Sequence, residues 1–365
     1  MDMGKKTTRT ILITGGAGFI GCNLAQRLLA DPSARVRIFD NLSRVGVEAN
    51  LEWLHRLEGA ERLEFVKGDV RDAPAVAAAA RKATEIYHLA AQVAVTTSVE
   101  NPREDFEINV GGTLNVLEAA RLSSERPFVL FTSTNKVYGS LPRIPVEVER
   151  THYRAAIPDF CGVNEEEPLD FHSPYGCSKG AADQYVRDYA RIYRMSTVVF
   201  RMSCIAGPRQ FGTEDQGWVA HFLYSTLDRK PITVYGDGFQ VRDVLHVYDL
   251  IDAMSAVRAH LPRTSGEIYN LGGGTVRAVS VVEMLDAIER STGVPPSLCY
   301  SEVRPGDQPL YIADTSKLAA QTGWSPRRSL NDTLGDIYGF WRGHRRLLGT
   351  HQKMLHAHEL VGEVA

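Results

Sequence analysis

The chain has 365 residues, of which 44% are hydrophobic and 23% charged, and its formal net charge at pH 7 is -3. This is the profile of a globular protein large enough for one α/β unit or two joined domains, and it gives no electrostatic reason to expect a nucleic acid or a membrane surface as partner. The five cysteines include no Cys-x-x-Cys pair and the N-terminus lacks an apolar secretory stretch, so we expect a reducing cytoplasm and no metal site.

Short β-branched runs alternate with helical stretches from residue 9 to residue 203. The runs read RTILITG, RVRIFD, LEFVKGD, EIYHLAA, PFVLFTS and STVVFRMS. This alternation predicts a Rossmann-like, doubly wound parallel sheet covered by helices on both faces. After residue 203 the chain breaks into pieces rich in glycine and proline, which predict a smaller, loop-rich C-terminal domain for the substrate. We therefore expect a sheet domain at 9–203, a second domain at 204–345 and a tail at 346–365, with residues 239–275 returning partly to the sheet.

The first strand runs directly into TGGAGFIG, where Gly15, Gly18 and Gly21 lie three residues apart at the start of a predicted helix. Such a turn admits a pyrophosphate against the backbone N–H groups of the helix N-terminus, although a glycine triplet alone also fits a tight turn. Asp40 closes the second strand, where its carboxylate is placed to accept hydrogen bonds from an adenosine ribose. This position favours NAD over NADP, and the nearby Arg44 leaves the choice open.

Two residues four apart, Tyr175 and Lys179, stand at a predicted helix entrance in SPYGCSKGAADQY. Pairs at this spacing are common on solvated helices. Here, however, the fifth strand ends in FTSTNK and brings Ser133 and Thr134 to the sheet edge where a nicotinamide is expected. A hydroxyl, a phenol and an ammonium at that place form a proton-transfer set, in which Lys179 and the cationic ring lower the pKa of Tyr175.

With these motifs, the chain from residue 9 to residue 341 resembles the extended short-chain dehydrogenase/reductase family. The resemblance implies NAD as cofactor and a catalytic set of Thr134, Tyr175 and Lys179, supported by Asn109 in INVGGTLN. The expected cofactor-binding residues are Gly15, Gly18, Phe19, Ile20, Gly21, Asp40, Asn41, Ser43, Arg44, Asp69, Val70, Leu89, Ala90, Ala91, Gln92, Asn109, Ser133, Tyr175, Lys179 and Met202.

The second half carries segments, GDGFQVRDVLHVYDL and RPGDQ, that are similar to the family's nucleotide-sugar segments. They imply that Arg242 and Arg304 bind the substrate diphosphate, with Arg209 as a weaker candidate, because a guanidinium is well suited to a phosphate. Cys204 stands where relatives often carry an asparagine, and it is expected to be a packed residue rather than a nucleophile. The expected substrate-binding residues are Thr134, Asn135, Lys136, Cys204, Arg209, Trp218, Tyr235, Arg242 and Arg304.

The residues that follow Thr134 bear on the reaction. Dehydratases of the family typically continue with Asp-Glu, whereas this chain has Asn135 and Lys136, which counts against dehydration. Longer stretches are similar to the family's 2-epimerases with a CDP-hexose as the favoured substrate. A sugar C2–H without a neighbouring carbonyl is not acidic, so inversion there is expected to pass through a 2-keto sugar formed with bound NAD. The alternatives are a 4-epimerase or another nucleotide-sugar oxidoreductase, and, in a different class, an NAD-sensing binding protein.

Two further expectations concern regions around this site. The resemblance implies a homo-oligomer, a dimer or a tetramer, in which helices such as residues 113–121 and 179–193 pair between subunits. The long connection over residues 140–172 is expected to shape the sugar pocket.

Overall fold

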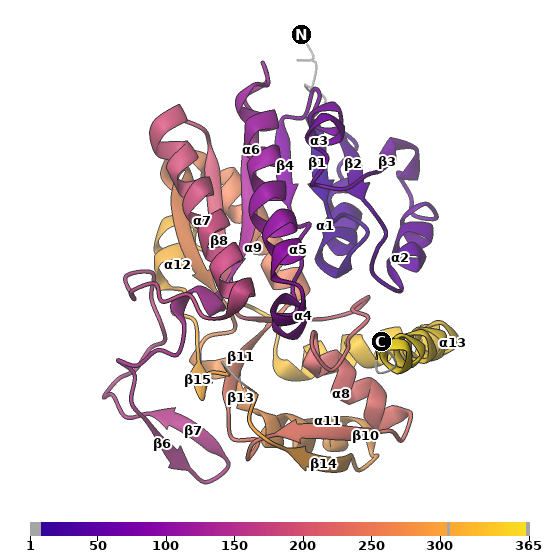
Figure 1. Ribbon diagram of the computed structural model, residues 1–365, viewed down its shortest axis with the longest axis vertical. Helices are drawn as coiled ribbons and strands as arrows, with labels where there is room; N and C mark the ends of the chain where they lie inside the picture. Colours follow the sequence, from indigo (N-terminus) through magenta and orange to yellow (C-terminus); the bar gives the residue numbers. More distant parts are fainter. Residues whose placement is uncertain (1–8, 305–306, 363–365) are drawn as a thin grey trace, which may run out of the picture.

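The computed structural model describes residues 9–304 and 307–362. Its main sheet has seven parallel strands in the order β12-β8-β5-β4-β1-β2-β3 (Figure 1). The strands are β1 (Arg9–Thr14), β2 (Ala34–Asp40), β3 (Leu63–Lys67), β4 (Glu85–His88), β5 (Phe128–Thr134), β8 (Thr197–Met202) and β12 (Glu267–Leu271). The chain order reverses between β1 and β4, so the predicted doubly wound parallel sheet is confirmed, and this reversal is where ligands bind in such sheets.

Helices cover both faces of this sheet. Those of the main sheet region are α1 (Phe19–Leu29), α2 (Val47–Leu54), α3 (Ala73–Ala79), α4 (Val95–Glu100), α5 (Pro102–Phe106), α6 (Gly112–Arg121), α7 (Ser173–Tyr193), α9 (Val247–Ala259), α10 (Leu261–Thr264) and α12 (Ser316–Thr322). Helix α6 packs between α3 and α7 on one side, and α1 packs with α2 and α9 on the other. All seven residues of β5 are buried, as its apolar run requires for a strand covered on both faces.

The remaining elements form a smaller region below the sheet (Figure 1). They are the strands β9 (Cys204–Ala206), β10 (Pro231–Tyr235), β11 (Val241–His246), β13 (Ala278–Ser280), β14 (Ser297–Ser301) and β15 (Leu310–Tyr311), and the helices α8 (Trp218–Leu227), α11 (Val281–Thr292) and α13 (Leu330–Gly362). β11 pairs with β9, β13 and β15, while β10 pairs with β14. Residues 140–172 contain the antiparallel hairpin of β6 (Val146–Glu149) and β7 (His152–Ala155).

Four short helical turns complete the described elements, at Ala60–Arg62, Glu107–Gly111, Asn135–Tyr138 and Thr275–Arg277. The turn at Glu107–Gly111 is a π-helical turn between α5 and α6. Wide turns of this kind are frequent at functional sites because the extra residue redirects side chains.

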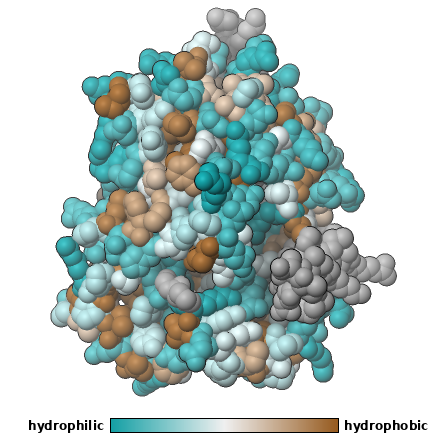
Figure 2. All heavy atoms as spheres, in the orientation of Figure 1, coloured by the Kyte–Doolittle hydropathy of each residue, from teal (hydrophilic) through white to brown (hydrophobic). Residues whose placement is uncertain are grey.

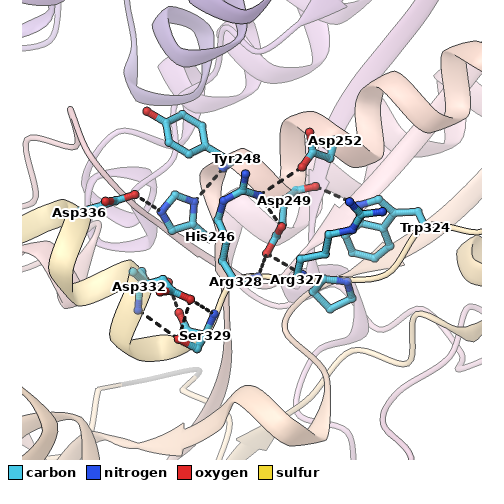
Figure 3. Close-up of polar contacts among 12 residues, drawn as sticks. His246, Tyr248, Asp249, Asp252, Trp324, Arg327, Arg328, Ser329, Asp332 and Asp336 are labelled. Atoms are coloured by element: carbon cyan, nitrogen blue, oxygen red, sulfur yellow. Dashed lines mark hydrogen bonds and ion pairs between the residues drawn. The ribbon is translucent and has the colours of Figure 1, made fainter.

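A buried polar cluster attaches the C-terminal segment to α9 (Figure 3). The carboxylate of Asp249 accepts hydrogen bonds from the backbone N–H groups of Arg327 and Arg328 and from the Arg328 guanidinium. Beside it, His246 accepts a hydrogen bond from the backbone N–H of Tyr248 and contacts Asp336 of α13. Helix α13 bends at His344 and continues to Gly362 through residues that the sequence places in a tail. No helix in the described part of the chain combines the length and apolar character needed to cross a bilayer.

Candidate active site

The glycine turn after β1 is shaped by close backbone approach. A Cβ atom at Gly21 would lie 2.4 Å from the carbonyl oxygen of Gly15, and Gly15 itself has a φ of +68°, which favours glycine. Gly18 is the N-cap of α1 and supplies no side-chain cap. The N–H groups in the first turn of α1 are therefore available to an anion, which is the arrangement that the sequence predicts for a pyrophosphate.

A pocket opens at this turn and follows the carboxyl ends of β1, β2, β3 and β4. Fourteen of the residues expected to bind the cofactor line it together: Gly15, Gly18, Phe19, Ile20, Gly21, Asp40, Asn41, Ser43, Arg44, Asp69, Val70, Leu89, Ala90 and Ala91. The lining also includes residues outside the expected set, from the strand ends and the loops after them, from α2, from the π-helical turn and from the loop after β9: Phe39, Val45, Val47, Asn50, Gly68, Val93, Ile108, Gln210, Phe211 and Gln216.

Two carboxylates lie in this pocket, one of them at the position where the sequence predicts the adenosine ribose. Asp40 accepts backbone N–H groups from Ala17 at 3.0 Å and Leu42 at 2.9 Å, and burial raises its pKa. Each of its oxygens still has a lone pair for a ribose hydroxyl. Asp69 is held by the side chain of Arg71 and by Asn41, and the bonds to Arg71 are the main reason that its pKa falls to about 2.

The predicted catalytic set lies together where β5 meets α7. Thr134 ends β5, and the Tyr175 hydroxyl is hydrogen-bonded to its side chain. Lys179, one turn further along α7, donates to the carbonyl oxygen of Thr132 at 2.6 Å and lies 4.2 Å from the centre of the Phe131 ring. All three members of the set are buried, so the tyrosine and lysine are not a solvated surface pair.

Burial sets the protonation of this pair. It raises the pKa of Tyr175 to about 12, against a lowering by the hydrogen bond to Thr134, and it lowers the pKa of Lys179 to about 7. The sequence predicted that Lys179 would lower the tyrosine pKa. In the structure Lys179 is not among the groups that shift the pKa of Tyr175: its ammonium donates to the Thr132 carbonyl, and desolvation of the phenol is the largest influence on that pKa.

Four further residues expected at the cofactor lie outside the pocket lined by the glycine turn. Met202 ends β8, and Asn109 accepts the backbone N–H of Gln92. The hydroxyl of Ser133 and the side-chain oxygen of Gln92 are buried and have no hydrogen-bond partner in the described chain. Buried polar atoms of this kind need a partner. Together with the glycine turn, these two atoms fit a dinucleotide whose nicotinamide end reaches toward Tyr175.

The substrate-side residues fall into two groups that acidic residues hold together. Asp307 lies 2.6 Å from the guanidinium of Arg242 and 3.6 Å from the ammonium of Lys136. The side chain of the next residue, Gln308, accepts a hydrogen bond from Asn135 at 2.9 Å. Asn135, Lys136 and Arg242 are thus brought together by Asp307 and Gln308, the last two residues of RPGDQ, for which the sequence predicted no role.

The second group surrounds Tyr235. The Arg304 guanidinium lies 3.8 Å from the centre of the Tyr235 ring and contacts the carboxylates of Glu214 and Asp215. The tyrosine hydroxyl also donates to Glu214. Both arginines expected to bind a diphosphate are therefore paired with acids in this structure, and an incoming phosphate has to compete with those acids.

Three other predicted substrate residues lie elsewhere. Arg209 lines the pocket at the glycine turn, where its guanidinium lies 3.2 Å from the centre of the Trp53 ring, so the structure does not bring it together with the other two arginines. Cys204 is hydrogen-bonded to Trp218, and burial raises the pKa of its thiol to about 12. A thiol with that pKa is not an activated nucleophile. Within residues 9–304 and 307–362, no group of three His, Cys, Asp or Glu side chains is arranged to hold a metal ion.

Comparisons with known proteins agree with this geometry. The family model described as GDP-mannose 4,6 dehydratase matches residues 12–337. The chain is 43% identical to the CDP-paratose 2-epimerase of Salmonella typhi, over 90% of this chain and 98% of that protein. It is similar to the structure of UDP-glucuronic acid 4-epimerase from Bacillus cereus with UDP-glucuronic acid and NAD, at a TM-score of 0.78 and 26% identity over 92% of this chain and 99% of that chain. A dTDP-glucose 4,6-dehydratase from Streptomyces venezuelae with NAD bound gives a TM-score of 0.79 and 31% identity, over 92% of this chain and 98% of that chain.

Proposed function

Because the chain belongs to the family of NAD-dependent epimerases and dehydratases, we propose that it is a nucleotide-sugar 2-epimerase. The observation that carries the proposal is the 43% identity to CDP-paratose 2-epimerase along 90% of the chain. The contacts among Thr134, Tyr175 and Lys179 supply the chemistry that such an enzyme needs. A CDP-linked hexose is the proposed substrate on the same grounds.

The cofactor is NAD, as in the structural relatives solved with it. The glycine turn and the N-terminus of α1 would hold its pyrophosphate, and Asp40 would hold the adenosine ribose. Tyr175 and Lys179 would lie at the nicotinamide ribose, close to the partnerless hydroxyl of Ser133. When bound, NAD supplies the acceptor and the donor of the hydride that an epimerisation through a ketone requires.

The protein's own part in the reaction is to move one proton and to hold the sugar. The Tyr175 phenolate would be favoured by the positive charge of bound NAD, against the desolvation that raises its pKa. That phenolate would take the proton of the C2 hydroxyl as the carbon is oxidised, and it would return the proton after the 2-keto sugar has turned over in the pocket. Thr134 would donate a hydrogen bond to the reacting oxygen. The arginines of the two substrate-side groups would hold the diphosphate during the turn, which keeps the ketone from leaving.

The site lacks the groups that dehydration requires. Elimination of water next to a ketone needs an acid and a base at neighbouring carbons. After Thr134 the chain offers Asn135, bound to Gln308, and Lys136, paired with Asp307. Neither is a carboxylic acid, and this supports epimerisation over dehydration.

The test uses purified protein, a panel of CDP-, GDP-, UDP- and dTDP-hexoses without added reductant, and NMR to follow the configuration at C2 and C4. Inversion at C2 that Tyr175→Phe abolishes would support the proposal and identify the base. Tyr189→Phe is the matched control, because Tyr189 lies on the same helix but bonds Glu118 away from the site. Retention of the substrate's carbon-bound hydrogen in deuterated water would support hydride transfer over enolisation. Elimination, net NADH formation or silence across the panel would contradict the proposal.

Inversion at C4 is the second candidate function. It is favoured by the structural likeness to UDP-glucuronic acid 4-epimerase, at a TM-score of 0.78. The same panel separates the two, because a 4-epimerase inverts the configuration at C4 and leaves C2 unchanged.

We also propose that the protein is a homo-oligomer in the cytoplasm. Apolar side chains are exposed on α5, just after α6 and on α7: Phe106 at 57%, Leu122 at 72% and Ile192 at 64% exposure. Figure 2 shows several apolar side chains over these helices, a face that a second copy of the chain would cover. The five cysteines are free thiols, as expected in a reducing compartment. Sedimentation velocity of the purified protein tests the oligomeric state.

A further inference from the structure

A buried acid, Asp105, lies behind the catalytic pair and takes no part in the reaction described above. It belongs to α5 and is 1% exposed. One of its oxygens accepts a hydrogen bond from the side-chain amide of Asn109 at 3.1 Å, and its carboxylate is also hydrogen-bonded to the hydroxyl of Ser178. The other oxygen, Oδ2, is buried without a partner in the described chain. Burying an incompletely bonded carboxylate destabilises a fold, so its presence calls for a reason.

The contacts of Asp105 lead directly to the catalytic helix. Asn109 stands in the π-helical turn, one turn after Asp105, and its amide also contacts Ser178 of α7 at 3.0 Å. Ser178 lies next to Lys179 in the chain, and its hydroxyl is 3.2 Å from the carbonyl oxygen of Tyr175. The same helix is fixed at its start by Ser98, which accepts the backbone N–H of Tyr175 at 3.1 Å. These bonds join α5 to the stretch of α7 that carries both catalytic side chains.

The charges around Lys179 leave Asp105 as its principal counter-charge. Asp183 is the other carboxylate, and it is matched by Arg201 through bonds of 2.8 and 3.0 Å. His88 is neutral, since burial lowers its pKa to about 3 and both ring nitrogens contact threonine hydroxyls. The charged and titratable groups that interact with Lys179 are Asp105 of α5, Asp183 of α7 and His88 of β4. Arg201 of β8 pairs with Asp183, and Tyr175 lies one turn before Lys179 on α7.

We propose that Asp105 is a positioning residue, which fixes α7 through Asn109 and Ser178 and supplies the buried negative charge that keeps Lys179 an ammonium beside Tyr175. The catalytic role of Tyr175 and Lys179 rests on the function proposed above, whereas the effect of Asp105 on the pKa of Lys179 does not. The sign follows from the charge. A carboxylate at this place raises the pKa of Lys179 and also that of Tyr175. Its removal is therefore expected to lower both.

The test is the titration of Lys179 in the full-length protein, followed by NMR of chains labelled with ¹³C at lysine Cε. Lys179→Met assigns the signal. In the wild type the lysine is expected to titrate with a pKa of about 7. Asp105→Asn, which keeps the side-chain shape and removes the charge, is expected to lower that pKa by about half a unit or more. Glu104→Gln, which removes the same charge from the neighbouring half-exposed residue, is expected to leave it unchanged.

The same spectra contain an internal control. Lys136, beside Asp307, is expected to titrate with a pKa of about 8, and Asp105→Asn is expected to leave that pKa unchanged. If Asp105→Asn disturbs Lys136 as well, the fold has changed and Ser178→Ala carries the test. That variant removes one hydrogen bond from Asp105 and is expected to lower the pKa of Lys179 by a smaller amount. An unmoved Lys179 signal in the folded variants would overturn the proposal, whatever reaction the protein catalyses.

A second readout links the charge to catalysis. In Asp105→Asn both limbs of the pH profile of kcat/KM are expected to shift to lower pH, because Tyr175 and Lys179 each lose a proton at a lower pH than in the wild type. A loss of activity without a shift of the profile would mean that Asp105 serves only the fold and would also overturn the proposal. If the wild type shows no epimerisation, the titration of Lys179 still tests the role of Asp105. Failure of the proposed function and failure of this inference therefore give different results.

Discussion

Removing the charge of Asp249 is expected to destabilise the attachment of the C-terminal segment. This carboxylate is fully buried and accepts three hydrogen bonds: from the backbone N–H groups of Arg327 at 3.2 Å and Arg328 at 2.9 Å, and from the Arg328 guanidinium at 2.6 Å (Figure 3). An asparagine keeps one acceptor oxygen and replaces the other with a donor. In Asp249→Asn the amide oxygen can serve the two backbone groups, and its NH₂ group then faces the guanidinium.

The magnitude follows from that rearrangement. A hydrogen bond to a charged group contributes about 1.5–3 kcal/mol, and breaking a fully buried ion pair costs about 3–5 kcal/mol. Arg328 is 29% exposed and also contacts Asp252, so part of its interaction is recovered. We expect Asp249→Asn to lower the free energy of unfolding by about 2–3 kcal/mol.

Urea unfolding followed by circular dichroism at pH 7 measures this change. The matched control is Asp252→Asn, which removes the second acid on the same arginine, at 32% exposure, and is expected to change stability by less than about 1 kcal/mol. Equal effects of the two variants would refute the reasoning, because they would mean that burial of Asp249 does not increase the contribution of its ion pair with Arg328 to the free energy of unfolding.

Two further variants test the cofactor and substrate sides. Gly21→Ala is expected to abolish retention of NAD, because its Cβ atom would lie 2.4 Å from the Gly15 carbonyl oxygen. The absorbance of nucleotide released by heating measures the retained cofactor. The control is Gly335→Ala, where a Cβ atom meets nothing within 4 Å, and this variant is expected to retain NAD. Lys136 has a pKa of about 8, so its positive charge is present below that pH and lost above it. Affinity for a nucleotide sugar, measured by calorimetry, is therefore expected to fall as the pH rises through 8. If the affinity of Lys136→Met falls by the same amount over this pH range, Lys136 does not bind the anion.

The sheet and its cofactor edge could be predicted because their signals are local. Gly15, Gly18 and Gly21 lie within seven residues, and each strand end carries its own apolar run, so fourteen of the residues expected to bind the cofactor could be named that line one pocket in the structure. Arg209 shows the limit of such signals. Its loop lies far along the chain, and only the tertiary fold places its guanidinium against Trp53 in the cofactor pocket, while sequence context grouped it with the other arginines.

The protonation of the catalytic pair could not be predicted from spacing. The four-residue interval correctly predicted that Tyr175 and Lys179 face the same way on one helix, but the desolvation that sets their pKa values depends on everything packed around them. The role of Asp105 could not be predicted for the same reason, because its burial depends on tertiary packing. In the sequence it is one acid in a charged stretch, PREDFE, and nothing local distinguishes it from its half-exposed neighbour Glu104.

The substrate side shows how one scaffold can favour one reaction over another. The proton-transfer pair and the cofactor turn serve any chemistry that begins with oxidation of a sugar carbon, so they do not select between epimerisation and elimination. The selection falls to the residues just after Thr134, and here they are fixed by partners: Asn135 by Gln308 and Lys136 by Asp307. A side-chain amide is not acidic enough to protonate a leaving hydroxyl, and Lys136, close to Arg242, is expected to hold an anion. Asp307 contacts both Lys136 and Arg242, so the residue that pairs with Lys136 also holds one of the arginines expected to bind the diphosphate.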